Sequence, residues 1–351
     1  MIHLNDFLNH KSEWLKGTGP HSDIVISSRI RLARNLASFP FPHWSNKKQS
    51  KDVLDTVEQA VGKIDYLKST TIFALADLDS LDKQFLVERH LMSYEHAHKT
   101  DSKAVVVDHE EIVSLMINEE DHIRLQVMQS GFNLFEAWNI INRIDDCLAK
   151  ELPFAFSLEY GYLTACPTNT GTGMRGSVML HLPALVIIGQ IKQVLNAISK
   201  LSFTTRGLYG EGTEATGNFF QVSNQVSLGH SETEIIENIN GLIRQIIEQE
   251  NQARETLISK NKAVVEDKIS RSFGILKNAH IISSQETTEL LSMVRLGVSL
   301  GLIKEIDSST VNELFIITQP AHLQKLENKK LSSQERDVKR AEIVRDKLNK
   351  Q

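Results

Sequence analysis

Residues 103–128, KAVVVDHEEIVSLMINEEDHIRLQVM, decide the fold class of this chain of 351 residues. Three runs rich in β-branched and long apolar residues, at 103–107, 112–118 and 122–128, are separated by short polar stretches. Runs of this composition and length are typical of consecutive antiparallel strands joined by turns. The segment therefore predicts a β-meander, with residues 108–111, DHEE, as the turn between its first two strands.

Helical patterns and further strands surround this meander, so we expect an α+β domain with an antiparallel sheet flanked by helices. Apolar residues recur with helical spacing at 51–66, 79–97 and 132–150. The other predicted elements are strands at 23–31, 155–167 and 177–185, a helix at 184–201, and a hairpin of 217–224 with 225–229.

The character of the sequence changes after about residue 255. Ser231 and Glu234 have the spacing of a capping box, which opens a long amphipathic helix. The residues after 255 keep a helical pattern, are rich in lysine and arginine, and carry few strand signals. We therefore predict an α+β domain at 1–254 and a small all-helical C-terminal domain at 255–351.

The composition excludes several classes of protein. With 41% hydrophobic residues, 24% charged residues and a net charge of −5, the chain is typical of soluble globular proteins and not of bulk nucleic-acid or membrane binders. Its N-terminus lacks the apolar core of a secretory signal, and no apolar run is long enough to cross a bilayer. Cys147 and Cys166 are the two cysteines. They disfavour a disulfide framework and a cysteine-based zinc site, and they favour a cytosolic location.

Two arginines share one face of the strand predicted at 23–31. Arg29 and Arg31 are two positions apart, so both side chains point the same way. Such guanidinium groups repel each other unless an anion lies between them, and their planar forks match phosphate oxygens. Taken alone, the pair favours a solvated edge strand.

Residues 118–124, NEEDHIR, place three carboxylates at the end of an apolar strand. Because acidic residues are poor strand formers, the stretch is a turn between two strands. A carboxylate at this turn is also positioned to bind a cation or to accept a proton. The two interpretations are equally favoured by these residues alone.

Residues 166–177, CPTNTGTGMRGS, have the ingredients of an anion-binding loop. The glycines free backbone N–H groups, and Thr170, Thr172 and Arg175 add donors, although the lysine of a Walker A loop is missing. Cys166 precedes this electropositive loop, where a thiolate is stabilised. A lone cysteine is otherwise a small buried hydrophobe.

Residues 206–217, RGLYGEGTEATG, alternate glycines with carboxylates. This pattern fits a mobile loop that closes over a ligand. Taken alone, the stretch favours an ordinary long hairpin loop.

Taken together, these clusters indicate phosphoryl transfer. Five arginines lie in strand ends or loops and would neutralise a triphosphate. Glu120 and Glu211 would then face the acceptor from two sides, which favours a positively charged nitrogen as the acceptor. Catalysis of that kind rests mostly on positioning and electrostatics. The five arginines are Arg29, Arg31, Arg124, Arg175 and Arg206.

The four clusters resemble the phosphagen kinases, the family of creatine and arginine kinases. The family pattern S-T-R-x-R, N-E-E-D-H-x-R, C-P-[ST]-N-x-G-T-x-x-R and R-G-x-x-G-E is matched in order and in spacing. The resemblance implies the family fold, with ATP and Mg²⁺ as cofactors. It implies that the five arginines bind the nucleotide phosphates and that His90, in LVERH, lies near the adenine.

The resemblance also implies the roles of the acceptor side. Glu120 and Glu211 would hold the guanidinium, one of them as base, with the Cys166 thiolate against it. Glu120 is our preferred base, and we expect no covalent phosphocysteine. The neighbours expected to contact the nucleotide are Ser28, Ile30, Gly176, Ser177, Val178, Met179, Gly207, Leu208, Tyr209 and Gly210. No metal-ligating residues are predicted.

Two departures from the small-molecule enzymes bear on the acceptor. Their second adenine-side histidine falls at Met179, so the adenine packing must differ. They also carry a helical domain of roughly a hundred residues before the S-T-R-x-R strand. Only 26 residues precede Ser27 here. In the small-molecule enzymes that domain closes over the free acceptor. Without it, we expect an open acceptor site, which suits an arginine side chain on a polypeptide.

The whole chain is similar to one branch, the bacterial protein arginine kinases of the McsB type. Residues 336–341, RDVKRA, match the RDxxRA motif of that branch. The resemblance implies a second, allosteric phosphoarginine pocket at Arg336, Asp337, Arg340 and Ala341. Composition alone favours a charged face on a terminal helix.

The same resemblance implies the biological setting: marking of proteins for the ClpC-ClpP protease, inactivation of the heat-shock repressor CtsR, and activation by McsA. The helical tail suggests a homodimer. Two alternatives stay open, a kinase of free arginine and a catalytically silent adaptor that binds phosphoarginine. Intact arginines, glutamates and cysteine argue against silence.

Overall fold

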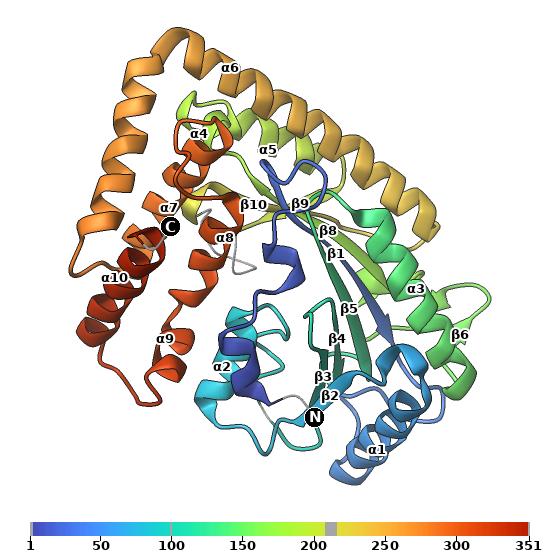
Figure 1. The fold of residues 1–351 in the computed structure, drawn as a ribbon. Coiled ribbons are helices and arrows are strands. Elements are labelled where there is room, and N and C mark those ends of the chain that lie inside the picture. The colour runs from blue at the N-terminus through green and yellow to red at the C-terminus, as the bar shows by residue number, and fades with distance from the viewer. Residues whose placement is uncertain (1–2, 99, 208–215, 350–351) are drawn as a thin grey trace.

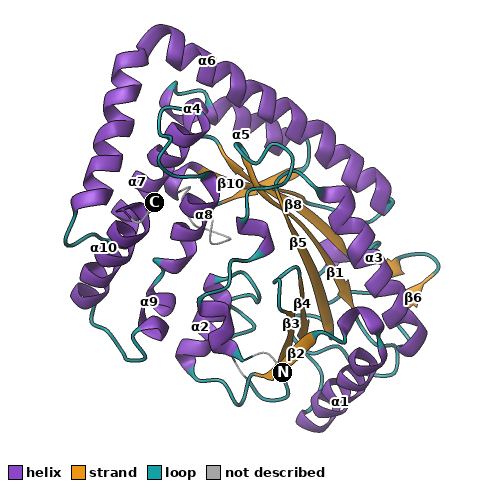
Figure 2. Cartoon of the chain, viewed as in Figure 1, coloured by secondary structure: helices purple, strands orange, loops and turns teal. Residues whose placement is uncertain are grey.

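The structure is a computed structural model that describes residues 3–98, 100–207 and 216–349. Over those residues, eight strands form one antiparallel sheet in the order β2-β3-β4-β5-β1-β8-β10-β9, which is strongly twisted (Figures 1 and 2). Its strands are β1 Val25–Arg34, β2 Thr70–Ala74, β3 Ala104–Asp108, β4 Val113–Ile117, β5 Ile123–Ser130, β8 Met174–His181, β9 Phe203–Arg206 and β10 Phe219–Asn224.

The predicted meander is confirmed and forms three of the eight strands of this sheet. β3 pairs with β4 and β4 with β5, both antiparallel, and the DHEE turn joins the first two strands. The alternation of β1 then decides which face holds the core. Ile30 and Leu32 are fully buried, whereas Arg29 and Arg31 lie on the other face.

Helices cover the apolar face of the sheet. α3 Leu134–Glu151 packs on β1 and β5, α6 Glu232–Asn278 packs on β8 and β10, and α1 Lys47–Lys63 lies against α3 (Figure 1). A second apolar core, around Phe7 and Phe85, joins β3 and β4 to α2 Ser80–Glu88 and the short turn of helix η1 Leu4–Leu8. Because Met116 of this second core pairs with Arg124, the second core lies on the same face of the sheet as the arginines.

The C-terminal region is helical, as predicted. The capping box of Ser231 and Glu234 starts α6, which continues through position 255 and has one non-helical residue, Asn261. Two further helices, α7 Ser284–Ser299 and α10 Ser333–Asn349, pack against α6. Next to them, α8 Ser308–Ile317 packs against α7, and α9 Pro320–Leu326 packs against α10 and α2. The predicted boundary between 254 and 255 therefore lies within a continuous helix.

A buried arginine ties this helical region to the sheet. Arg295 of α7 donates to the carbonyl oxygens of Ser22 and Asp23 just before β1, and to Asn312 of α8. It also contacts His181 at the end of β8. Because a buried guanidinium needs several acceptors, this network fixes α7 against the body of the molecule.

Four predicted elements are wrong in detail. The helix predicted at 79–97 ends at Glu88, because the chain reverses at His90, whose φ is +60°. The predicted strand 155–167 is instead a small hairpin of β6 Phe156–Ser157 and β7 Gly161–Tyr162. Gly161, with φ of +72°, permits its tight turn.

Two further corrections concern the segment that follows β8. Gly189, at φ +75°, splits the helix predicted at 184–201 into α4 Pro183–Ile187 and α5 Ile191–Lys200. The hairpin predicted within 217–229 does not form, since β10 pairs with β8 and β9. Among the described residues, no helix combines the length and apolar character that crossing a bilayer would need.

Candidate active site

Strand pairing brings the predicted arginines together on one face of the sheet. Arg31 on β1 lies opposite Arg175 on β8, and Arg124 and Arg206 come from β5 and β9. These four line a cavity of about 650 Å³. Arg29 lies two positions before Arg31 and lines a smaller pocket next to it. The other residues lining the large cavity include His43, Glu95, Lys103, Glu119, Glu120, Asp121, Cys166, Thr168, Asn169, Thr204 and Gln225.

The arginines repel one another. Burial, followed by the charges of Arg124, Arg175 and Arg206, lowers the pKa of Arg29 to about 9. The pKa of Arg31 is also lowered well below its ordinary value, by burial and then by the neighbouring arginines. The Arg31 Nε is buried and finds no hydrogen-bond acceptor in the described part of the chain. A multiply charged anion would satisfy this donor and relieve the repulsion, so the cluster fits the phosphates of ATP.

The three carboxylates of the NEEDHIR stretch have different surroundings. Glu119 accepts hydrogen bonds from Arg124 and from the Ser93 hydroxyl, both at 2.6 Å. Burial would raise the pKa of Glu119, but these partners outweigh burial and lower it to about 2. Asp121 is buried and accepts hydrogen bonds from Asn35 and from the backbone N–H of Ala165. Both carboxylates are therefore committed to the structure.

Glu120 differs from its two neighbours. Its half-buried side chain lines the cavity, and its carboxylate has no hydrogen bond or ion pair with any other described residue. Burial and then the charges of Asp121 and Glu119 raise its pKa. A carboxylate held in this way is available to bind a guanidinium or accept a proton.

Cys166 lies on the same cavity, at the start of the anion-binding loop. The loop begins with the short turn of helix η4 Pro167–Asn169, and Cys166 occupies its N-cap position. The Cys166 Sγ is 3.1 Å from the Thr168 hydroxyl, and the Thr164 hydroxyl donates to the Cys166 carbonyl at 2.8 Å. The thiol is free and half-buried. Cys166 and Glu120 thus line the cavity together with the arginines.

His90 lies in the smaller pocket that adjoins Arg29. Its ring meets Trp14 edge-on, with centroids 5.4 Å apart, and its carbonyl accepts from Gln126 at 2.8 Å. Burial and then the charge of Arg29 lower the pKa of His90 to about 4, so the imidazole is neutral at neutral pH. Met179 also lines this pocket. The pocket is small, with a free volume of about 20 Å³, and its lining beside Arg29 is mostly neutral.

The other residues predicted to contact the nucleotide are distributed over both faces of the sheet. Ser177 is 3.4 Å from the Arg29 Nε, and the Gly176 N–H donates to Asn224. Ser28 bonds to the backbone of Gly131 and Asn133. Ile30 and Val178 are buried in the core, so only their backbone faces the site. Gly207 is described, whereas Leu208, Tyr209, Gly210 and Glu211 lie outside the described residues.

Sequence reasoning missed several residues of the site. Trp14 lies in a turn of helix, η2 Glu13–Leu15, and reaches the pocket only through the tertiary fold. His43 and Gln126 are a loop residue and a strand residue without a motif of their own. The alternation of β5 could have indicated Gln126, because it shares a strand face with Arg124.

The RDVKRA residues lie on α10, and the structure places their polar atoms in internal contacts. Arg340 is buried and donates to the carbonyl oxygens of Thr318 and Ile282 and to Asp337. Arg336 donates to the carbonyl oxygen of Leu331, and Ala341 is buried. In this arrangement the motif ties α10 to the end of α8 and to the connection between α6 and α7.

Comparisons with known proteins identify the family of this chain. Residues 52–253 match the family described as ATP:guanido phosphotransferase, C-terminal catalytic domain, and residues 262–351 match the protein-arginine kinase McsB C-terminal domain. The protein-arginine kinase of Halothermothrix orenii is 48% identical over 347 residues, which cover 99% of each chain. That of Symbiobacterium thermophilum is 48% identical over 342 residues, covering 97% of each.

Solved structures show the same fold. A duplicated taurocyamine kinase from Schistosoma mansoni, bound to transition-state analogue components, superposes with a TM-score of 0.62 at 26% identity. The match covers 67% of this chain and 34% of that one. A lombricine kinase superposes with a TM-score of 0.59 at 24% identity, and the match covers 65% of this chain and 66% of that one.

Proposed function

The chain belongs to the protein-arginine kinases of the ATP:guanido phosphotransferase family, and we propose that the cavity beside the arginine cluster is where ATP passes its γ-phosphoryl group to an arginine side chain of another protein. One observation carries the proposal. Arg31 and Arg175 line the same cavity as Glu120 and Cys166, which puts phosphate-binding groups beside groups suited to a guanidinium. The cavity therefore has a donor half and an acceptor half.

In the donor half, the arginines hold the phosphates. Burial, and then the charges of neighbouring arginines, lower the pKa values of Arg29 and Arg31, and a triphosphate would neutralise this buried positive charge. Because these groups come from rigid strands, they need little reorganisation as charge develops in the transition state. Mg²⁺ bound together with the nucleotide would supply further charge neutralisation. The neutral His90 and Trp14 line the pocket proposed for the adenine.

In the acceptor half, Glu120 and Cys166 position the guanidinium. Arginine has a pKa above about 12 and arrives protonated, so it must lose one proton as its nitrogen forms the bond to phosphorus. Glu120 accepts that proton, while the P–O bond to the leaving ADP breaks. The Cys166 thiolate adds negative charge beside the guanidinium and helps to hold it in line. Glu211, which lies outside the described residues, would bind the guanidinium from the other side.

The finer biological role is part of the proposal. Resemblance to the McsB branch supports marking of proteins for the ClpC-ClpP protease, inactivation of the CtsR repressor, and activation by McsA. The same resemblance supports an allosteric phosphoarginine pocket at Arg336, Asp337, Arg340 and Ala341. We propose a cytoplasmic enzyme, since its two cysteines are free thiols. We also propose a homodimer formed through the helical region.

The proposal is tested by supplying two acceptors in parallel. The full chain is incubated with labelled ATP, Mg²⁺ and either casein or free L-arginine. Label on casein that is lost in acid and kept in base supports transfer to protein arginine. Label on free arginine alone would make the chain a phosphagen kinase, and no transfer to either acceptor would leave a silent phosphoarginine-binding adaptor.

A further inference from the structure

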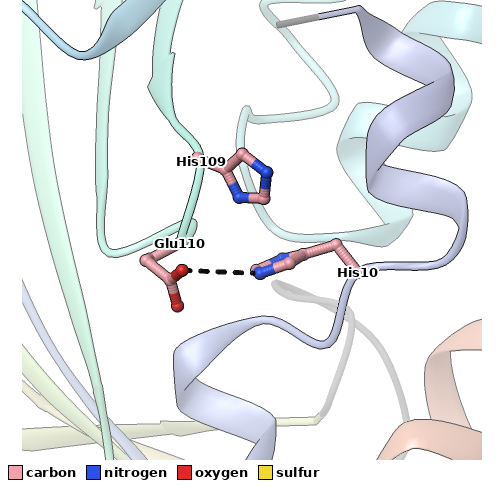
Figure 3. A group of neighbouring side chains, drawn as sticks. All are labelled: His10, His109 and Glu110. Carbon is pink, nitrogen blue, oxygen red and sulfur yellow. Dashed lines mark ion pairs between the residues drawn. The ribbon is translucent and has the colours of Figure 1, made fainter.

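Two histidines and a carboxylate meet on the surface away from the active-site cavity. His109 and Glu110 belong to the turn between β3 and β4, and His10 follows η1 near the start of the chain (Figure 3). One ligand atom from each side chain lies within 4.8 Å of the other two. The two imidazole rings are edge to face, with centroids 4.6 Å apart. Segments distant in sequence thus place three metal-binding groups together.

The surroundings orient two of these groups. The His10 Nδ1 is 3.5 Å from the carboxylate of Glu111, which is buried and held by Arg89. The His10 Nε2 points the other way and is 3.7 Å from the Glu110 Oε1. The Nδ1 is buried and makes no hydrogen bond within the described part of the chain, so a slight turn of the ring would be needed for Nδ1–H to donate to Glu111, the arrangement that fixes the tautomer of metal-binding histidines. It leaves Nε2 as the ligand atom, on the side of Glu110 and His109.

We propose that His10, His109 and Glu110 bind one Zn²⁺-class transition-metal ion, with water as the fourth ligand. Two imidazole nitrogens and one carboxylate oxygen are a ligand set that zinc accepts, and Mg²⁺ does not favour nitrogen ligands. Metal bonds of about 2.0–2.2 Å place tetrahedral ligand atoms about 3.3 Å apart. The exposed side chains of His109 and Glu110 can turn inward to reach that spacing.

The neighbouring charges are compatible with a bound cation. Lys16 bonds to the Glu110 Oε2 at 3.0 Å and to Glu13 at 2.8 Å, which leaves the Glu110 Oε1 facing His10. The charges of Lys16, Arg89, Glu13, Glu110 and Glu111 sum to −1. A cation is therefore attracted, and Lys16 would act from outside the ligand shell by orienting the carboxylate.

Metal binding would clamp the N-terminal segment to the sheet. Phe7 of η1 packs into the second apolar core with Phe85 of α2, and the His10 carbonyl accepts from Arg89. A metal joining His10 to the β3–β4 turn would cross-link these contacts. Because the unfolded chain does not hold the three ligands together, binding should stabilise the folded state.

The test measures zinc on the full chain, without ATP. Chelator-treated protein is titrated with Zn²⁺ by calorimetry, and the melting temperature is recorded in parallel. His109→Ala and Glu110→Gln change exposed side chains, so neither should impair folding. His280→Ala removes an exposed histidine outside the cluster and is the matched control.

We expect both cluster variants to lose one equivalent of bound Zn²⁺, or at least tenfold in affinity, together with most of the zinc-induced rise in melting temperature. His280→Ala should match the parent chain. Zinc held by Cys147 or Cys166 would stay equal in all four proteins. The proposal is overturned if parent and cluster variants bind the same number of zinc equivalents with the same affinity, or if the parent binds none.

Discussion

Arg31 on β1 lies directly opposite Arg175 on β8, in the middle of an antiparallel sheet. Like charges placed opposite each other in neighbouring strands are destabilising. Here the cost is increased because the Arg31 Nε is buried without an acceptor in the described structure. The pairing therefore fits an anion-binding site. It lowers the stability of the protein without an anion, and a bound anion would remove the repulsion.

Replacing Arg31 should raise the stability of the protein without nucleotide and at the same time weaken nucleotide binding. We expect Arg31→Met to raise the free energy of unfolding of the ligand-free chain by about 1 kcal/mol, because a buried charge without a partner is removed. Affinity for ADP should fall at least tenfold, or about 1.4 kcal/mol. Melting temperatures with and without ADP measure both effects. Arg271→Met, an exposed control, should change neither, and a full ADP-induced shift in Arg31→Met would contradict the assignment.

The two adjacent glutamates should respond differently to the same change. Glu120→Gln should abolish transfer to protein while ADP still raises the melting temperature, because the arginine cluster stays intact. Glu119→Gln should instead lower stability, since Arg124 loses the carboxylate that it contacts at 2.6 Å. Transfer assays and thermal melts distinguish the two. Undiminished transfer by Glu120→Gln would remove it from the role of base.

The raised pKa of Glu120 predicts the acid side of the pH profile. A base must be deprotonated to work, so kcat/KM should fall as the pH falls through the pKa of Glu120. Since burial raises that pKa, the fall should be centred above 4.5, the ordinary value for a glutamate. The profile is measured with saturating Mg²⁺-ATP. Activity that stays constant down to pH 4.5 would argue against a buried carboxylate base.

Cys166 should matter through its charge. Cys166→Ser keeps the size and the contact with Thr168 but cannot form a thiolate at neutral pH. We expect kcat to fall by about 10²-fold, the scale of a misplaced acceptor, with ADP binding unchanged. No phosphate should be found covalently on the cysteine in the wild-type chain. Full activity of the serine variant would make the thiol merely structural.

Glu88 should make stability depend on pH. It ends α2 and accepts hydrogen bonds from the backbone N–H groups of Ala321 and His322 at the start of α9. Burial, acting against those hydrogen bonds, raises its pKa to about 7. A carboxyl group whose pKa is raised in the folded state stabilises the fold while it is protonated. Its contribution to the free energy of unfolding is therefore full below about pH 4.5 and is lost as the pH rises through about 7.

Glu88→Gln should remove that pH dependence. Between pH 4.5 and 7.5, the wild-type free energy of unfolding should decline relative to the variant by on the order of 2 kcal/mol. Urea unfolding at several pH values measures the difference. If the free energies of unfolding of the two proteins changed in parallel with pH, Glu88 would titrate normally, and its protonation would not affect the contact between α2 and α9.

Local sequence patterns predicted the elements that position the site. The meander, the alternation of β1 and the Ser231–Glu234 capping box depend on neighbouring residues, and all three were found in the structure. Features set by single glycines were misjudged, such as the break at Gly189. A propensity pattern does not reveal where φ becomes positive.

Tertiary contacts were beyond local patterns. Trp14 beside His90, and His10 beside His109, join segments that no periodicity connects. The different surroundings of Glu119 and Glu120 likewise depend on Ser93 and Arg124, which reach them through the fold. Resemblance to a family supplied the roles of the arginines, but the structure was needed to show that Arg31 lies opposite Arg175.

The most direct test of the central claim is mass spectrometry of the phosphorylated residues. Casein is incubated with the full chain and Mg²⁺-ATP, digested at neutral to basic pH and fragmented without acid exposure, with Glu120→Gln as the control. The account predicts phosphate on arginine side chains, dependent on Glu120 and lost on brief acid treatment. Phosphate on serine or threonine, or equal phosphoarginine from the Glu120→Gln variant, would contradict it.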